Sequence, residues 1–147
     1  MNDTILVAVN DSPAGFSAAE IAVDYARRLA APLHAVTVVQ PDSPELNTGP
    51  LDGADLADRR EKGGEAVLHH VTTLAIAAGV EVTSHLRRGV VAAELIAEAR
   101  EIGAGLIVMA LVDRASHAIP YIGSNTLRVM EFATVPVLVV PAFHAES

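Results

Sequence analysis

The 147-residue sequence contains no cysteine, which excludes a disulfide framework, a thiolate metal site and a thiol nucleophile. Basic residues are also scarce, since 10 Lys and Arg stand against 18 Asp and Glu for a formal net charge of -8. Nucleic-acid binding depends largely on cationic side chains that displace counterions from phosphates. The charge balance therefore argues against DNA or RNA as a partner.

Long apolar runs are missing as well. No run approaches the roughly 18 residues that a membrane span requires. The first four residues, Met1 to Thr4, include no basic residue, and Ile5 to Val9 is too short for the apolar segment of a signal peptide. We therefore expect a cytoplasmic protein without a membrane span.

Aromatic residues make up only 3% of the chain, although 51% of it is hydrophobic. The core must then be built from Ala, Val, Leu and Ile, which is typical of parallel sheets covered by helices. A second core would need on the order of 100 residues of its own. We expect a single domain over residues 1–147.

Short runs rich in β-branched residues predict the strands of this domain. There are five such runs: Thr4 to Val9, Leu33 to Val39, Glu81 to His85, Leu106 to Ala110 and Val135 to Val140.

Apolar residues at helical spacing fill the stretches between these runs and predict four helices. The first starts at Ser12-Pro13, an N-cap followed by proline at the first helical position. The other three are expected from near Ala54 to Gly79, from Gly89 to Gly103 and from about Gly123 to Phe132, with Gly63-Gly64 loosening the first half of the second helix.

The alternation of strands and helices predicts the α/β class, with a five-stranded parallel sheet, right-handed crossovers and helices on both faces. This is a Rossmann-like arrangement. Ligands of such sheets bind beyond the carboxyl ends of the strands, at the point where the winding reverses. The loops after Val9 and Ala110 are therefore the candidate site, and the second, residues 111–122, is long enough to suggest a function.

Several segments along the chain together resemble the universal stress protein family over essentially its whole length. Ile5 to Pro13 resembles the family's opening strand and turn, V-A-x-D-x-S, and Leu33 to Val39 its second strand. Further matching segments are Arg88-Gly89, Gly103 to Met109, Gly123-Ser124 and Pro136 to Val140. The resemblance implies the fold of the adenine nucleotide alpha hydrolase-like proteins.

The resemblance also implies a phosphate-binding loop, G-x2-G-x9-G-[ST], whose four positions fall at Ala110, Asp113, Gly123 and Ser124. Only Gly123 and Ser124 match; they can present backbone N–H groups to phosphate at a helix N-terminus. Ala110 is a mild departure. A carboxylate at position 113, about 4 Å from a phosphate charge, would cost roughly 4 kcal/mol at an effective dielectric constant of about 20, part of which Arg114 could offset.

The adenine and ribose half of the implied site is better preserved. Val39 lies where the family reads adenine with backbone atoms, and Asn10 replaces the usual Asp, which removes a charge but keeps hydrogen-bonding capacity. The full set of candidate binding residues is Asn10, Asp11, Ser12, Val39, Gly89, Ala110, Asp113, Gly123, Ser124 and Asn125. Ser12 is also explained as a helix N-cap, and Gly89 by turn geometry.

No catalytic or metal-ligating residue is predicted. The six histidines, at positions 34, 69, 70, 85, 117 and 144, lack a recognised ligand spacing. Ser12 and Ser124 lie in no G-x-S-x-G elbow, and no pair of carboxylates suggests acid–base chemistry.

The last strand predicts a partner. Pro136 to Val140 is apolar, comes last and should form a sheet edge that no charge protects. Two such edges meeting about a two-fold axis would cover each other, as is typical of the family's dimers. We expect a homodimer through Val135 to Val140.

Three functions stay open at this point. The first is a non-enzymatic regulatory or stress-response dimer, with a protein as its further partner and weak or absent ATP binding. The second is a sensor that binds an adenine nucleotide or another small ligand. The third is a slow ATP hydrolase, for which no base or metal carboxylate is found. The cofactor is accordingly none, or ATP or AMP held weakly.

Overall fold

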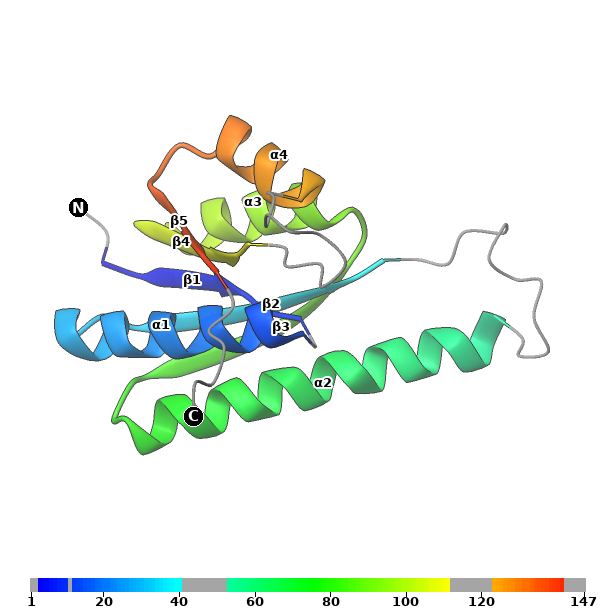
Figure 1. Ribbon diagram of the computed structural model, residues 1–147, viewed down its shortest axis with the longest axis horizontal. Coiled ribbons are helices and arrows are strands. Elements are labelled where there is room, and N and C mark those ends of the chain that lie inside the picture. The colour runs from blue at the N-terminus through cyan, green and yellow to red at the C-terminus, as the bar shows by residue number, and fades with distance from the viewer. Residues whose placement is uncertain (1–2, 11, 41–52, 112–122, 142–147) are drawn as a thin grey trace.

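The protein folds as a parallel sheet between two layers of helices (Figure 1), as shown by a computed structural model that describes residues 3–10, 12–40, 53–111 and 123–141. The elements follow one another as β1 (Ile5–Ala8), α1 (Pro13–Leu29), β2 (Leu33–Val39), α2 (Gly53–Ala77), β3 (Val82–Arg88), α3 (Val91–Ile102), β4 (Leu106–Ala110), α4 (Ser124–Phe132) and β5 (Val137–Val140). The predicted α/β class is confirmed.

The sheet has the strand order β3-β2-β1-β4-β5, and every pairing is parallel. Val7 of β1 lies between Ala35 of β2 and Val108 of β4. The winding therefore reverses between β1 and β4, where the sequence places the candidate site. The same order leaves β5 at one edge of the sheet.

Successive residues of the central strands point to opposite faces, and each face has its own core. Ile5 and Val7 pack with α1 and α2 on one face, whereas Leu6 packs with α3 and α4 on the other. Ala18, Ala19 and other alanines of α1 are fully buried. Their small side chains let the helix lie close to the sheet, which is how a core with few aromatic residues is filled.

Helix α1 begins where the sequence predicts. Ser12 has an extended backbone, and its hydroxyl accepts a hydrogen bond from the Gly15 N–H at 3.0 Å, with Pro13 at the first helical position. The cap satisfies one of the N–H groups that have no partner within the helix.

Two predicted details are wrong. The third strand does not end at His85 but continues to Arg88, because Arg87 is fixed by carboxylates of α3. Gly63-Gly64 does not interrupt α2. A Cβ at Gly64 would lie 3.0 Å from Thr37 Cγ2, so this glycine lets the helix approach β2 closely.

The predicted bounds of the first and last strands were also too wide. β1 covers Ile5–Ala8 and β5 covers Val137–Val140. None of the helices in the described part of the chain is long and apolar enough to cross a membrane.

Candidate functional site

A cleft opens at the carboxyl ends of β1 and β4, beside the N-termini of α1 and α4. Its cavity measures about 320 Å³, at the lower end of the range for small-molecule sites. The residues that line it come from β1, β2, β4 and the starts of three helices: Ala8, Val9, Asn10, Ser12, Pro13, Ala14, Val36, Val38, Val91, Leu95, Met109, Ala110, Leu111, Asn125 and Thr126. The position is the one expected for a ligand of a doubly wound sheet.

The turn after β1 holds the polar side of the cleft. Ser12 Oγ donates a hydrogen bond to Asn10 Oδ1 at 2.5 Å and accepts one from the Gly15 N–H. Because Asn10 Oδ1 accepts this hydrogen bond, the side-chain NH2 group of Asn10 is left to act toward the cleft as a donor. One serine thus caps α1 and orients Asn10.

Gly15, which the sequence analysis did not single out, makes this turn possible. A Cβ at position 15 would lie 2.4 Å from the backbone oxygen of Asn10 and 2.4 Å from Asn10 Oδ1. Any side chain there would displace Asn10. The sequence did contain a signal, because glycine is a poor helix former and its presence in the first turn of a helix indicates a steric reason.

The opposite wall joins the end of β4 to the start of α4. The hydroxyl of Thr126, which is buried, donates to the Ala110 carbonyl oxygen at 3.3 Å. Gly123 is the N-cap of α4 and offers no side-chain cap, and the first turn contains no acidic residue. The backbone N–H groups of this turn therefore form the positive end of a helix dipole beside the cleft.

The described lining residues carry no charged side chain. Asn10, Ser12, Asn125 and Thr126 supply its side-chain hydrogen-bonding groups, and the rest of the lining is apolar. Such a surface can hold a flat, apolar or weakly polar group, whereas it has no Lys or Arg among these residues to neutralise several phosphate charges.

Of the ten predicted binding residues, four line the cavity and two lie outside the described part of the chain. Asn10, Ser12, Ala110 and Asn125 line the cavity. Asp11 and Asp113 fall outside the described residues, as do Arg114 and His117.

The remaining candidates do not line the cavity. Val39 and Gly89 meet each other, since the Gly89 N–H donates to the Val39 carbonyl oxygen at 3.1 Å. Gly89 has a φ of +142°, a conformation that L side chains rarely adopt, so its turn requires glycine. Gly123 and Ser124 lie just before the lining residues of α4. All of these assignments stay predictions.

Sequence reasoning missed the apolar walls of the cleft. Val36 and Val38 alternate along β2 and so face the same side of the sheet, where Val91 and Leu95 of α3 meet them. The alternation was visible in the sequence, but which face belonged to the cleft depends on the strand order.

The model of the universal stress protein family matches residues 1–141. The chain belongs to the universal stress protein family. Comparison with curated protein sequences gave no significant match.

Solved structures of other universal stress proteins superpose over nearly the whole chain. A family member from Burkholderia pseudomallei is 31% identical, with a TM-score of 0.76 over 95% of this chain and 96% of that one. UspA from Lactobacillus plantarum is 23% identical, with a TM-score of 0.80 over 95% and 99%. A protein from Archaeoglobus fulgidus, solved in complex with dAMP, is 20% identical, with a TM-score of 0.69 over 93% and 96%.

Proposed function

We propose that this universal stress protein is a non-enzymatic regulatory dimer of the stress response that binds ATP weakly or not at all. The observation that carries the proposal is that the described residues of the cleft lining carry no charged side chain. Sites that hold a triphosphate combine backbone N–H groups with Lys, Arg or a bound Mg²⁺. Here the described lining supplies polar amides and hydroxyls, and the sequence adds a carboxylate at position 113 of the phosphate loop.

A sensor for a less charged adenine compound is the second candidate. A cavity of about 320 Å³ with Val36, Val38 and Leu95 on one wall suits a flat base, and Asn10 and Ser12 offer polar groups to a sugar. The relative from Archaeoglobus fulgidus that was solved with dAMP is consistent with a monophosphate. AMP or adenosine would place less negative charge near position 113 than ATP does.

Hydrolysis of ATP is the least supported function. A hydrolase needs a group that orients or deprotonates water and a means of neutralising the transferred phosphate. The described lining contains no His, Asp, Glu or Lys.

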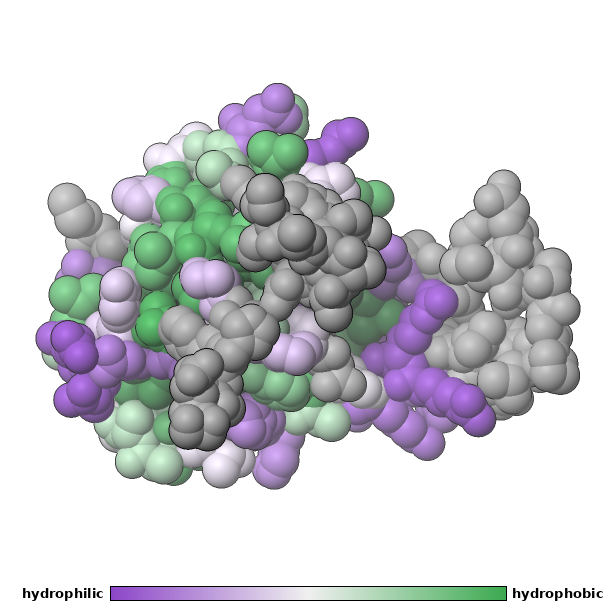
Figure 2. Space-filling model, in the orientation of Figure 1, coloured by the Kyte–Doolittle hydropathy of each residue, from purple (hydrophilic) through white to green (hydrophobic). Residues whose placement is uncertain are grey.

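The open edge of the sheet supports the dimer. β5 comprises four apolar residues, Val137–Val140, and lies at the edge beside β4. Figure 2 shows hydrophobic side chains gathered over this edge, between α4 and α1. An uncharged edge strand presents backbone groups for pairing, and a second copy would cover both edges about a two-fold axis.

Calorimetry with ATP, AMP and adenosine, with and without Mg²⁺, tests the account of the cleft. We expect Asp113→Gly to restore or strengthen ATP binding by up to about a thousandfold, since roughly 4 kcal/mol of repulsion is removed. Asp3→Gly, an exposed position before β1, is the matched control and should leave ATP binding unchanged. Equal ATP affinities of Asp113→Gly and the parent protein would contradict the role of position 113.

Light scattering tests the dimer separately. The parent protein should have about twice the 15.3 kDa mass of the chain at micromolar concentration. Val139→Lys puts a charge on the edge strand and should weaken the dimer at least about tenfold, whereas Thr134→Lys, at an exposed position before β5, should not. A parent protein that is only monomeric would overturn this part of the proposal.

A further inference from the structure

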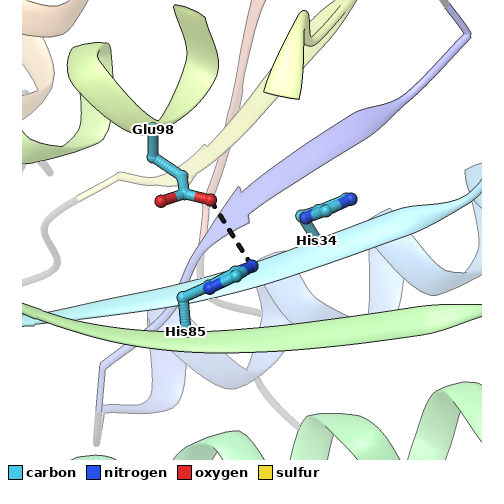
Figure 3. Close-up of side chains that lie close together, drawn as sticks. All are labelled: His34, His85 and Glu98. Atoms are coloured by element: carbon cyan, nitrogen blue, oxygen red, sulfur yellow. Dashed lines mark ion pairs between the residues drawn. The ribbon is translucent and has the colours of Figure 1, made fainter. Parts of the chain in front are cut away.

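Three side chains that are far apart in the sequence converge between the sheet and α3. His34 comes from β2, His85 from β3 and Glu98 from α3, and both imidazoles point toward the helix from which the carboxylate descends (Figure 3). One ligand-type atom from each of the three residues lies within 4.8 Å of the other two. The register explains the meeting, because His85 pairs with Val36, two residues beyond His34 on the same face.

The two imidazoles have unused nitrogens. Their rings stack with a centroid distance of 5.6 Å and an interplanar angle of 3°. His34 Nδ1 and His85 Nε2 are buried without a hydrogen-bond partner, although His85 Nε2 lies 3.5 Å from Glu98 Oε2. Buried polar atoms of this kind cost free energy unless something pairs with them.

The carboxylate is held in place by its other oxygen. Arg87 Nη1 donates to Glu98 Oε1 at 2.6 Å, which leaves Oε2 facing His85. Glu98 is 3% exposed, so its negative charge lies inside the protein. Carboxylates that bind metals are typically held by a hydrogen bond from a neighbouring group, as Arg87 holds Glu98 here.

The charge around the cluster is negative as a whole. Arg87 also contacts Glu94 at 2.8 Å and Glu101 at 3.2 Å. One guanidinium thus faces three carboxylates, and the group carries two negative charges that are not balanced within it. A divalent cation would compensate that excess.

We propose that His34, His85 and Glu98 form a binding site for a divalent transition-metal ion, with zinc as the best match. Two imidazoles and a carboxylate are a known zinc donor set, and three protein ligands leave a fourth position for water or another ligand. Imidazole nitrogens favour zinc, nickel and copper over Mg²⁺ and Ca²⁺, which prefer oxygen ligands. His85 is partly exposed, so the three residues lie near the surface of the protein although the ligand atom Nε2 is itself buried.

The state of His34 fits a ligand role. Burial, with the neighbouring His85 acting in the same direction, lowers the pKa of His34 below its ordinary value. A neutral imidazole is the form that binds a metal.

The proposal departs from the expectation from sequence that the histidines bind no metal. It is also separate from the cleft, although β2 and α3 serve both. Val36, Val38 and Leu95 line the cavity, whereas His34 lies before the two valines on β2 and Glu98 lies after Leu95 on α3.

Metal binding can be measured on the untagged full chain after treatment with a chelator. Calorimetry with Zn²⁺ should show one equivalent bound, and Co²⁺ should give the visible absorption of a tetrahedral site. The thermal midpoint should rise with Zn²⁺, because a ligand that binds only the folded state stabilises it. Mg²⁺ at the same concentrations should produce neither the absorption nor the shift.

Variants decide whether these three residues hold the ion. His34→Gln and His85→Gln should each weaken Zn²⁺ binding at least about tenfold and abolish the Co²⁺ absorption. His69→Gln, at an exposed position of α2, is the matched control and should bind like the parent protein. Circular dichroism of both variants establishes that they fold, so a loss of binding is not a loss of structure.

Two results would overturn the proposal. One is the absence of Zn²⁺ binding by the parent protein at micromolar concentrations. The other is binding that survives in both His34→Gln and His85→Gln, which would place the ion at other histidines of the chain.

Discussion

The two ends of one sheet face differ in their chemistry. The cleft at the carboxyl ends of β1 and β4 is lined by apolar and uncharged polar residues, whereas the cluster below α3 gathers two histidines, three glutamates and an arginine. β2 supplies Val36 and Val38 to the first region and His34 to the second. Among the described residues, buried charge therefore lies at Glu98, away from the site that the fold would favour.

Removing the arginine of the cluster should have the largest effect on stability. Arg87→Met leaves the buried Glu98 carboxylate without its cation and next to Glu94, which should destabilise the protein by about 3 kcal/mol. Chemical denaturation measures the loss. Arg88→Met removes the neighbouring arginine, whose ion pair with Glu61 is exposed, and should cost less than about 1 kcal/mol. Equal costs would show that the cluster is no more than a surface ion-pair network.

The turn of the cleft can be tested in the same way. Gly15→Ala puts a methyl group into the space of Asn10, and we expect a loss of about 2 kcal/mol from this overpacking. Gly63→Ala is the matched control, since a Cβ there meets nothing within 4 Å. It should stabilise α2 by about 0.5 to 1 kcal/mol. Thermal or urea unfolding that shows the same sign for both variants would contradict the close approach of Asn10 and Gly15.

Loss of the Ser12 hydroxyl should have the smallest effect. Ser12→Ala removes the cap of α1 and the hydrogen bond to Asn10, at a cost of about 1 kcal/mol. Ser84→Ala, at an exposed position of β3, should change the free energy of unfolding by no more than about 0.5 kcal/mol. If Ser12→Ala is as stable as the Ser84 variant, the hydroxyl does not organise the turn.

The cleft end of the molecule could largely be predicted from the sequence. Hydrophobic runs identified all five strands, and their alternation with helices fixed the class and the place where a ligand would bind. The end of β3 could not be predicted, because Arg87 and Arg88 are charged and their place in the strand depends on pairing with β2 and, for Arg87, on contacts with α3.

The cluster could not be predicted for a related reason. His34 and His85 belong to different strands, and no spacing of two histidines along the chain signals a pairing that depends on strand register. Glu98 looked like one more glutamate of a helix face. Its burial follows from the way α3 packs over β2 and β3, which only the tertiary structure shows.

We expect that this cleft, whose described lining is uncharged, does not retain a triphosphate. A calorimetric titration of the unaltered protein with ATP, beside AMP and adenosine in the same buffer with Mg²⁺, tests it most directly. The account predicts no ATP binding at micromolar concentrations and no gain in affinity from adenosine to AMP to ATP. Micromolar binding of ATP that is tighter than that of AMP and adenosine would contradict it.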